Sequence, residues 1–397
     1  MDSFTYSRLG PGELRLLRPV SIRDGTFISL EIKHFTRNRA PQYAALSYTW
    51  GEGDETDMIL LDERKFPVRR NLWSALNYLG LNAYHSKAQY LWVDAICINQ
   101  EDVAERNAQV SVMDEIYKNA CYVSIWLGLD PRVELYRDRV HGPIRTFDAG
   151  NLIWGEYAKK LADHEYWSRY WVIQECLLAR DIQVHCGRSI TPWEHFREAV
   201  SLDANVDLYT VPEDSRYTET LDARKHGALP LLLARLPGDD FVQIRPLEQL
   251  IIHHRHSRCK DPRDRVFALL GLCEPGERAS LERYFPNYSL SPDRVIVITL
   301  AHIRDVNGEP VTMESQKLLQ GLGVESKERQ RKLVAAAADF PYYIGYDDNP
   351  SDESREARAR YLALGEDCGL YQYEEDGDNE FNVTDDEPSS TGRCNML

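Results

Sequence analysis

Residues 91–128, LWVDAICINQEDVAERNAQVSVMDEIYKNACYVSIWLG, run from a short apolar strand through a polar loop and an amphipathic helix to a second strand. The helix is indicated by Met113, Ile116, Tyr117 and Ala120, which keep the i, i+3, i+4, i+7 spacing of one buried face. The returning strand is expected at 122–127. This order is that of a βαβ unit, and it predicts an α/β fold with a mainly parallel sheet flanked by helices.

Polar residues follow the first of these strands. Asp94 comes where the strand is expected to end, at the edge of an open parallel sheet where ligands usually bind. A strand-end aspartate also commonly organises its own loop by accepting backbone N–H bonds, and Asn99 could do the same. Ligand contact and loop organisation therefore both remain open for Asp94 and Asn99.

Further strands and helices are expected on both sides of this unit. An opening β-hairpin is expected over 14–32, and a buried strand over 44–50 leads into the glycine-containing loop that begins at Gly51. Asp261 and Pro262 are typical of a helix start. The remaining expected elements are a small hairpin at 59–68, helices at 72–79, 167–178 and 333–338, and a strand at 181–186.

These elements suggest four regions. We expect a β-hairpin leader at 1–40 and a core domain at 41–190 with an insertion at 129–160. A mainly helical extension at 191–345 follows, and then an acidic tail at 346–397 that is poor in aliphatic residues, which favours disorder.

Composition limits the classes of function. The formal net charge is −16, of which residues 347–397 carry −11 from 15 acidic and 4 basic side chains. Such a balance argues against a nucleic-acid-binding body. No apolar stretch reaches the roughly 18 residues of a membrane span, and the eight scattered cysteines are typical of reduced packing residues. We therefore expect a cytoplasmic protein.

Two groups of residues are candidates for chemistry. Trp171 and Glu175 lie four residues apart, which places them on one helix face, and an aromatic neighbour tends to raise the pKa of a carboxyl group. Ser47, Tyr48 and Trp50 supply a hydroxyl, a phenol and an indole at a strand end, a set suited to stacking on a planar ring. Ordinary helix packing and buried aromatic packing explain the same patterns, so neither group decides function alone.

Other common chemistries have weaker support. The segment 253–259, HHRHSRC, holds possible metal ligands, but no second matched pair accompanies it, so we expect no metal site and no prosthetic group. No cysteine has the signature of a Cys-His hydrolase, and no P-loop motif is present.

Three blocks together resemble the signature of the fungal heterokaryon-incompatibility (HET) domain. They are Ala45–Gly51 (ALSYTWG), Leu91–Gly128 and Tyr170–Glu175 (YWVIQE). The later segments 261–272 and 286–289 are similar to ones that commonly follow that domain, so the resemblance covers roughly residues 40–300. It implies a protein of fungal allorecognition and programmed cell death, which acts by self-association or with another death-signalling protein.

HET domains are regarded as distant relatives of TIR domains, whose flavodoxin-like sheet can cleave NAD at the nicotinamide–ribosyl bond. The resemblance implies that Glu175 is the catalytic carboxylate and that NAD is a substrate. It places Ser47, Tyr48, Trp50, Gly51, Asp94, Asn99 and Trp171 around the bound dinucleotide. TIR-type sites generally assemble between protomers, so activity would depend on oligomerisation.

Two readings without catalysis remain open. The fold could be a non-enzymatic signalling module that self-associates, because most motif residues are apolar or aromatic. It could also be a degenerate domain that only pairs with an active partner.

Overall fold

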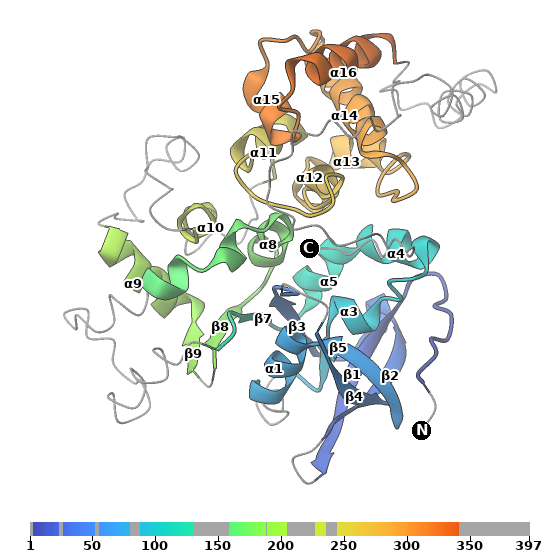
Figure 1. Ribbon diagram of the computed structural model, residues 1–397, viewed down its shortest axis with the longest axis vertical. Coiled ribbons are helices and arrows are strands. Elements are labelled where there is room, and N and C mark those ends of the chain that lie inside the picture. Colours follow the sequence, from blue (N-terminus) through green and yellow to red (C-terminus); the bar gives the residue numbers. More distant parts are fainter. Residues whose placement is uncertain are drawn as a thin grey trace. The chain divides into compact units, whose positions relative to one another are not determined.

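The computed structural model describes residues 3–23, 27–51, 55–79, 88–129, 159–187, 189–204, 227–235 and 244–340 of the 397-residue chain. The chain divides into two compact units at the junction of Ile244 and Arg245 (Figure 1). The expected insertion at 129–160 lies almost entirely outside the described residues, and the expected acidic tail lies wholly outside them.

The first unit is built on one sheet, which has nine strands in the described part of the chain. Its order is β5-β4-β2-β1-β6-β3-β7-β8-β9. The strands are β1 (Glu13–Arg23), β2 (Phe27–Thr36), β3 (Tyr43–Tyr48), β4 (Thr56–Leu61), β5 (Arg64–Arg69), β6 (Tyr90–Trp92), β7 (Val123–Trp126), β8 (Ile182–Cys186) and β9 (Ser189–Pro192).

The centre of the sheet is the parallel set β6-β3-β7-β8. Every residue of β3 and of β7 is buried, as expected for strands covered on both faces. The register pairs Ala45 with Trp92 and Tyr48 with Trp126. In chain order the four strands are β3, β6, β7 and β8, so the sheet grows from β3 to one side with β6 and then to the other with β7.

The sheet as a whole is mixed, so the prediction of a mainly parallel sheet was wrong. Among the described strands four pairings are parallel and four are antiparallel. The hairpins β1–β2, β4–β5 and β8–β9 are antiparallel, as expected for strands that only two or three residues of sequence separate. The expected opening hairpin is confirmed, and its strand β1 pairs with β6 through Leu17 and Leu91.

The segment between β6 and β7 forms three short helices instead of one. They are α3 (Asp94–Cys97), α4 (Val103–Val110) and α5 (Met113–Asn119). The expected buried face of Met113, Ile116 and Tyr117 lies on α5. The other helical elements of this unit are η1 (Arg37–Arg39), α1 (Arg70–Tyr78), η3 (Glu165–Ser168), α8 (Tyr170–Leu177), α9 (Trp193–Ala204) and α10 (Leu229–Ala234).

Helix α4 begins with a side-chain cap. The carboxylate of Asp102 accepts hydrogen bonds from the backbone N–H groups of Ala104, at 3.0 Å, and Glu105, at 3.1 Å. Replacing Asp102 with Ala removes the oxygen that accepts both hydrogen bonds, so we expect a loss of about 1 kcal/mol in the free energy of unfolding, measured by urea denaturation. Asp102→Asn keeps an acceptor and should lose less; equal stability of the Ala variant and the wild type would contradict this account of the cap.

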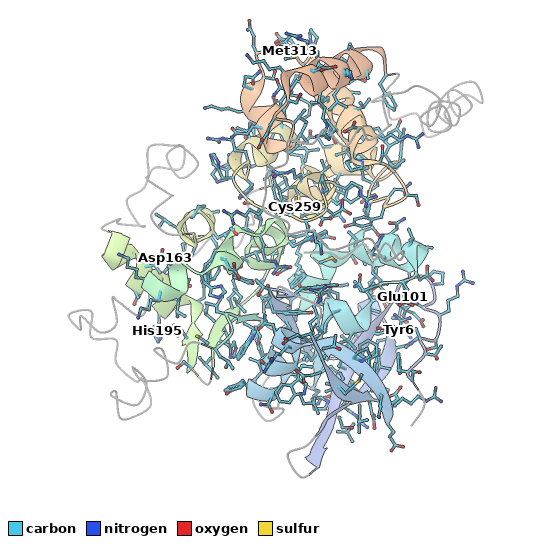
Figure 2. The ribbon with its side chains drawn as sticks, viewed as in Figure 1. Tyr6, Glu101, Asp163, His195, Cys259 and Met313 are labelled. Atoms are coloured by element: carbon cyan, nitrogen blue, oxygen red, sulfur yellow. The ribbon has the colours of Figure 1, made fainter. Side chains whose placement is uncertain are left out.

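The amino-terminal segment packs against the sheet through aromatic side chains. Phe4, Tyr6 and Phe66 form a cluster of edge-to-face rings, and Tyr6 is labelled in Figure 2. The Tyr6 hydroxyl donates a 2.9 Å hydrogen bond to the carbonyl of Ile96. The guanidinium of Arg15 lies 4.8 Å from the Tyr6 ring centroid. These contacts join the start of the chain to β5 and α3.

The helices of the second unit are joined by loops, and no strand longer than an isolated bridge occurs in its described residues, which agrees with the expected helical carboxyl-terminal extension. Its elements are α11 (Leu247–His253), α12 (Asp264–Phe267), η5 (Leu270–Leu272), α13 (Pro275–Leu281), α14 (Pro292–Asn307), α15 (Gln316–Gly321) and α16 (Lys327–Asp339). The expected helix start at Asp261 is wrong by three residues, because α12 begins at Asp264. Asp261 instead accepts a hydrogen bond from the backbone N–H of Arg263 within the preceding turn. Within the described segments no helix is both long enough and apolar enough to cross a membrane.

Candidate functional site

The candidate site lies at the carboxyl ends of the central parallel strands. Ser47 and Tyr48 are the last two residues of β3, Trp50 follows them, and Asp94 comes two residues after β6 ends. The sheet order reverses at β3, and ligands of open α/β sheets bind outside the carboxyl ends of the strands at such a reversal. The topology therefore brings these four side chains to the edge of the sheet where a ligand site is expected.

Glu175 reaches this edge from helix α8. The Ser47 hydroxyl donates a short hydrogen bond to Oε2 of Glu175, and the Tyr166 hydroxyl hydrogen-bonds the same Ser47 oxygen. All three side chains are buried: Ser47 is 1% exposed, Tyr166 0% and Glu175 3%. Residues that lie 128 positions apart in the sequence thus form one buried hydrogen-bonded group.

The environment of Glu175 changes its acidity. Its surroundings together raise the pKa of its carboxyl group from 4.5 to about 7, mainly through burial and with a smaller contribution from the charge of Asp94. The charge of Arg169 and hydrogen bonds from Ser47 and Tyr117 act in the opposite direction. A carboxyl group with a pKa near neutrality can both accept and release a proton, as general acid–base chemistry requires.

Asp94 forms the second half of the cluster. Its Oδ2 accepts a 3.1 Å hydrogen bond from the indole Nε1 of Trp50, and its Oδ1 accepts a 2.7 Å bond from the backbone N–H of Ala95. Burial raises the pKa of Asp94, while its hydrogen bonds and the charge of Arg169 lower it. Asp94 thus organises the start of α3 and also lies within reach of the group around Glu175, where its charge acts.

The charge of Arg169 acts on both carboxyl groups, and this residue was not predicted from the sequence. Its Nη1 donates a 2.6 Å hydrogen bond to the carbonyl of Tyr48, and its guanidinium lies 5.8 Å from the ring centroid of Tyr166. Tyr117 and Tyr166 were also not predicted as site residues. Tyr166 and Arg169 belong to an aromatic segment that is typical of helix packing. Only the fold shows that the Tyr166 hydroxyl hydrogen-bonds Ser47 and that Arg169 hydrogen-bonds the carbonyl of Tyr48.

Three further residues, Gly51, Asn99 and Trp171, were predicted as site residues. The carbonyl of Gly51, an exposed residue with a φ of 81°, accepts a hydrogen bond from Arg69. Asn99 organises its own loop, where its side chain accepts from the N–H of Glu101. Trp171 is 2% exposed, and its indole nitrogen has no hydrogen-bond partner among the described residues. Hydrogen bonds therefore join Ser47 to Glu175 and both Tyr48 and Trp50 to Asp94, whereas the hydrogen bonds described for Gly51 and Asn99 are with other residues.

Metal chemistry has no centre in the described parts of the chain. Over those residues no three His, Cys, Asp or Glu side chains gather as they would around a metal ion. In the segment 253–259 the rings of His253 and His254 contact each other edge to face, 4.7 Å apart.

Comparison with known proteins identifies the region that holds the cluster. Residues 43–175 match the family described as "Heterokaryon incompatibility protein (HET)", a match that starts with β3 and ends on Glu175. The chain is 24% identical to heterokaryon incompatibility protein 6, OR allele, of Neurospora crassa over 400 aligned positions. That alignment covers 82% of this chain but only 56% of the Neurospora protein. No solved structure is significantly similar. Residues 43–175 are therefore a HET domain, in a chain that is a distant homologue of the Neurospora protein.

Proposed function

We propose that this chain acts in fungal heterokaryon incompatibility and programmed cell death, and that its HET domain cleaves NAD at the nicotinamide–ribosyl bond when it is assembled. The observation that carries the catalytic part is Glu175, a buried carboxyl group with a pKa of about 7 that is held at the carboxyl end of β3. The homology to the Neurospora protein supports the biological part.

The strand order supports a relationship to the NAD-cleaving TIR domains. Taken in chain order, β3, β6, β7 and β8 lie in the spatial order 2-1-3-4, which is how a flavodoxin-like sheet begins. In such a sheet the ligand site lies at the carboxyl ends of the first and third strands, here β3 and β7. Glu175 accepts a hydrogen bond from Ser47, the penultimate residue of β3, and this supports the proposed role of Glu175.

The reaction we propose is a hydrolysis. The bond between C1′ of the ribose and the nicotinamide nitrogen breaks, and nicotinamide leaves with the bonding electrons and becomes neutral. Water adds to C1′ and releases one proton, so the products are nicotinamide, ADP-ribose and a proton. Ionised Glu175 would stabilise the positive charge that develops on the ribose and accept the proton from water, which is how glycoside-cleaving enzymes use carboxylates.

The residues of the proposed site are buried in the structure. Glu175 is 3% exposed, and Tyr48 and Trp50, which would stack on a ring of the dinucleotide, are 3% and 6% exposed. Access to NAD would therefore require the segments around the cluster to move apart. We propose that contact with a second copy of the chain, or with another death-signalling protein in the cytoplasm, opens the site.

The experiment compares assembled with unassembled protein. The chain is fused to a tetrameric coiled coil, and NAD loss is followed for the fusion, for the unfused chain, and for both carrying Glu175→Gln. We expect NAD loss from the wild-type fusion and at least a hundredfold lower rate for Glu175→Gln, in the range found when an electrostatic or acid–base catalytic group is removed. Glu165→Gln changes an exposed glutamate on η3 and serves as the matched control.

Two results would contradict the catalytic proposal. One is equal NAD loss in the wild-type and Glu175→Gln fusions, and the other is no NAD loss in any assembled form. The control variant should keep the rate of the wild type, which separates a specific effect of Glu175 from a general effect of a Glu→Gln change near α8.

A non-enzymatic scaffold is the second candidate function. It is favoured by the burial of the whole cluster and by the hydrogen bond that Ser47 already gives to Glu175, because a carboxylate satisfied in this way also serves structure. A scaffold predicts that the assembled wild type and Glu175→Gln cause cell death equally while cellular NAD stays constant.

A further inference from the structure

We propose that Arg169 is a positioning residue that fixes the charge and the orientation of Glu175 and couples it to Asp94. This inference deepens the proposed function and depends on it for its catalytic consequence. The charge of Glu175 can, however, be measured without turnover.

Arg169 holds helix α8 against the central strand β3. It lies between η3 and α8, with Tyr166 three residues before it and Glu175 six residues after it. It is 8% exposed, and Nη1 donates its 2.6 Å hydrogen bond to the carbonyl of Tyr48 at the end of β3. Arg169 thereby holds the turn that precedes α8 against the strand that carries Ser47.

Arg169 also contacts the ring of Tyr166. The guanidinium lies 5.8 Å from the centroid of the Tyr166 ring, within the range of a cation–π interaction. The hydroxyl of the same ring hydrogen-bonds Ser47, and Ser47 hydrogen-bonds Glu175. Arg169 therefore supports the ring that orients the donor to the carboxylate, which accounts for the orientation part of the proposal.

Arg169 also brings a positive charge to the cluster. The ionisable groups that act on Glu175 are Asp94 from the β6–α3 junction, Tyr117 from α5 and Arg169 from the start of α8. Tyr166 from η3 and Cys176 from α8 also interact with Glu175. Of these groups Arg169 is the cation, and it lowers the pKa of both Glu175 and Asp94. Two buried carboxyl groups thus share the charge of one arginine.

The two carboxyl groups are coupled through this arrangement. Negative charge on Asp94 raises the pKa of Glu175 and so opposes its ionisation. The positive charge of Arg169 lowers the pKa of both groups and so favours the state in which both are ionised. A ligand or partner that draws Arg169 away from the cluster would favour protonation of Glu175. A movement that keeps Arg169 in place while opening the site would favour the ionised form that the proposed reaction needs.

The test is a titration of the Glu175 carboxyl group by infrared spectroscopy on the full chain labelled with ¹³C-glutamate. Subtracting the Glu175→Gln spectrum isolates its signal, and the pH is varied from 5 to 10. We expect a midpoint of about 7 in the wild type. In Arg169→Gln we expect the midpoint to rise by about 1 to 3 units, the range for loss of a nearby opposite charge. Arg169→Lys keeps the positive charge and should titrate close to the wild type.

The second variant is Asp94→Asn, which removes the neighbouring negative charge and should lower the midpoint. It keeps the proposal testable where Arg169→Gln does not fold. An unchanged midpoint in Arg169→Gln or in Asp94→Asn would overturn the proposal. A Lys variant that titrates like the Gln variant would also overturn it, because Arg169 would then act by packing and not by charge.

The outcome is separable from that of the proposed function. The expected midpoints together with no NAD loss in any assembled form would reject NAD cleavage while supporting the role of Arg169. NAD loss together with unchanged midpoints would support NAD cleavage and reject the role of Arg169.

Discussion

Glu105→Gln should lower the free energy of unfolding of the first unit by about 3 to 5 kcal/mol, the usual effect of breaking a buried ion pair. Arg15 on β1 donates to both carboxylate oxygens of Glu105 on α4, at 2.5 and 2.9 Å. The two side chains are 1% and 8% exposed. The amide of the Gln variant leaves the guanidinium of Arg15 buried without its counter-charge.

The surroundings of the pair explain why the loss should be large. Arg15 also donates to the carbonyls of Ser7, at 2.6 Å, and Cys97, at 3.0 Å, so it is fixed and cannot turn to solvent. Glu105 accepts a further bond from the N–H of Asn99. The pair therefore joins the opening hairpin, the amino-terminal segment and the loop after α3.

Chemical denaturation of the full chain is the measurement, and an exposed pair provides the control. Arg18 and Glu31 form a 2.6 Å ion pair with side chains 51% and 27% exposed, so Glu31→Gln should have a much smaller effect. The double change Arg15→Met and Glu105→Leu should recover part of the loss, because two apolar side chains replace two charges while the bonds to Ser7, Cys97 and Asn99 are still lost. Equal effects of Glu105→Gln and Glu31→Gln would contradict this account.

The free energy of unfolding of Glu175→Gln, measured relative to that of the wild type, should be higher at neutral pH than at acid pH. The pKa of this carboxyl group is about 7 in the fold, against 4.5 in the unfolded chain. Between these values the unfolded chain loses the proton while the folded chain keeps it, so the stability of the wild type falls as the pH rises. At about 1.4 kcal/mol per unit, the shift corresponds to about 3 kcal/mol.

The measurement is the difference in unfolding free energy between Glu175→Gln and the wild type at pH 4.5 and at pH 8. The Gln variant lacks the ionisation, so we expect the difference to change by about 3 kcal/mol in its favour toward pH 8. The exposed Glu165→Gln should follow the wild type; parallel curves for Glu175→Gln and the wild type would mean that Glu175 is not held in a low-dielectric site.

The sequence predicts the central strands well because each one carries a local signal. The apolar runs that become β3, β6, β7 and β8 are all visible, as is the hairpin of β1 and β2. The place of the hairpin in the sheet is not visible, because pairing of Leu17 with Leu91 depends on contacts between distant segments. The break between α4 and α5 was also missed, because the apolar spacing alone does not show where the caps lie.

In the candidate site, too, some residues carry a local sequence signal and others are recognised only from contacts between distant segments. Ser47, Asp94 and Glu175 are each indicated by their position at a strand end or on a helix face, and the structure joins Ser47 to Glu175. Arg169 and Tyr166 have no local signal, since a buried arginine or tyrosine is recognised by the partners that the fold supplies. The predicted roles of Gly51, Asn99 and Trp171 at the dinucleotide stay predictions.

The most direct test of the central claim, that Glu175 makes the HET domain an NAD-cleaving site on assembly, is the stoichiometry of the products. Nicotinamide and ADP-ribose are quantified over time by chromatography for the coiled-coil fusion and its Glu175→Gln variant. We predict equal amounts of the two products from the wild type, and at most about one hundredth of that rate from the variant. Equal product formation by both proteins, or none by the assembled wild type, would contradict the claim.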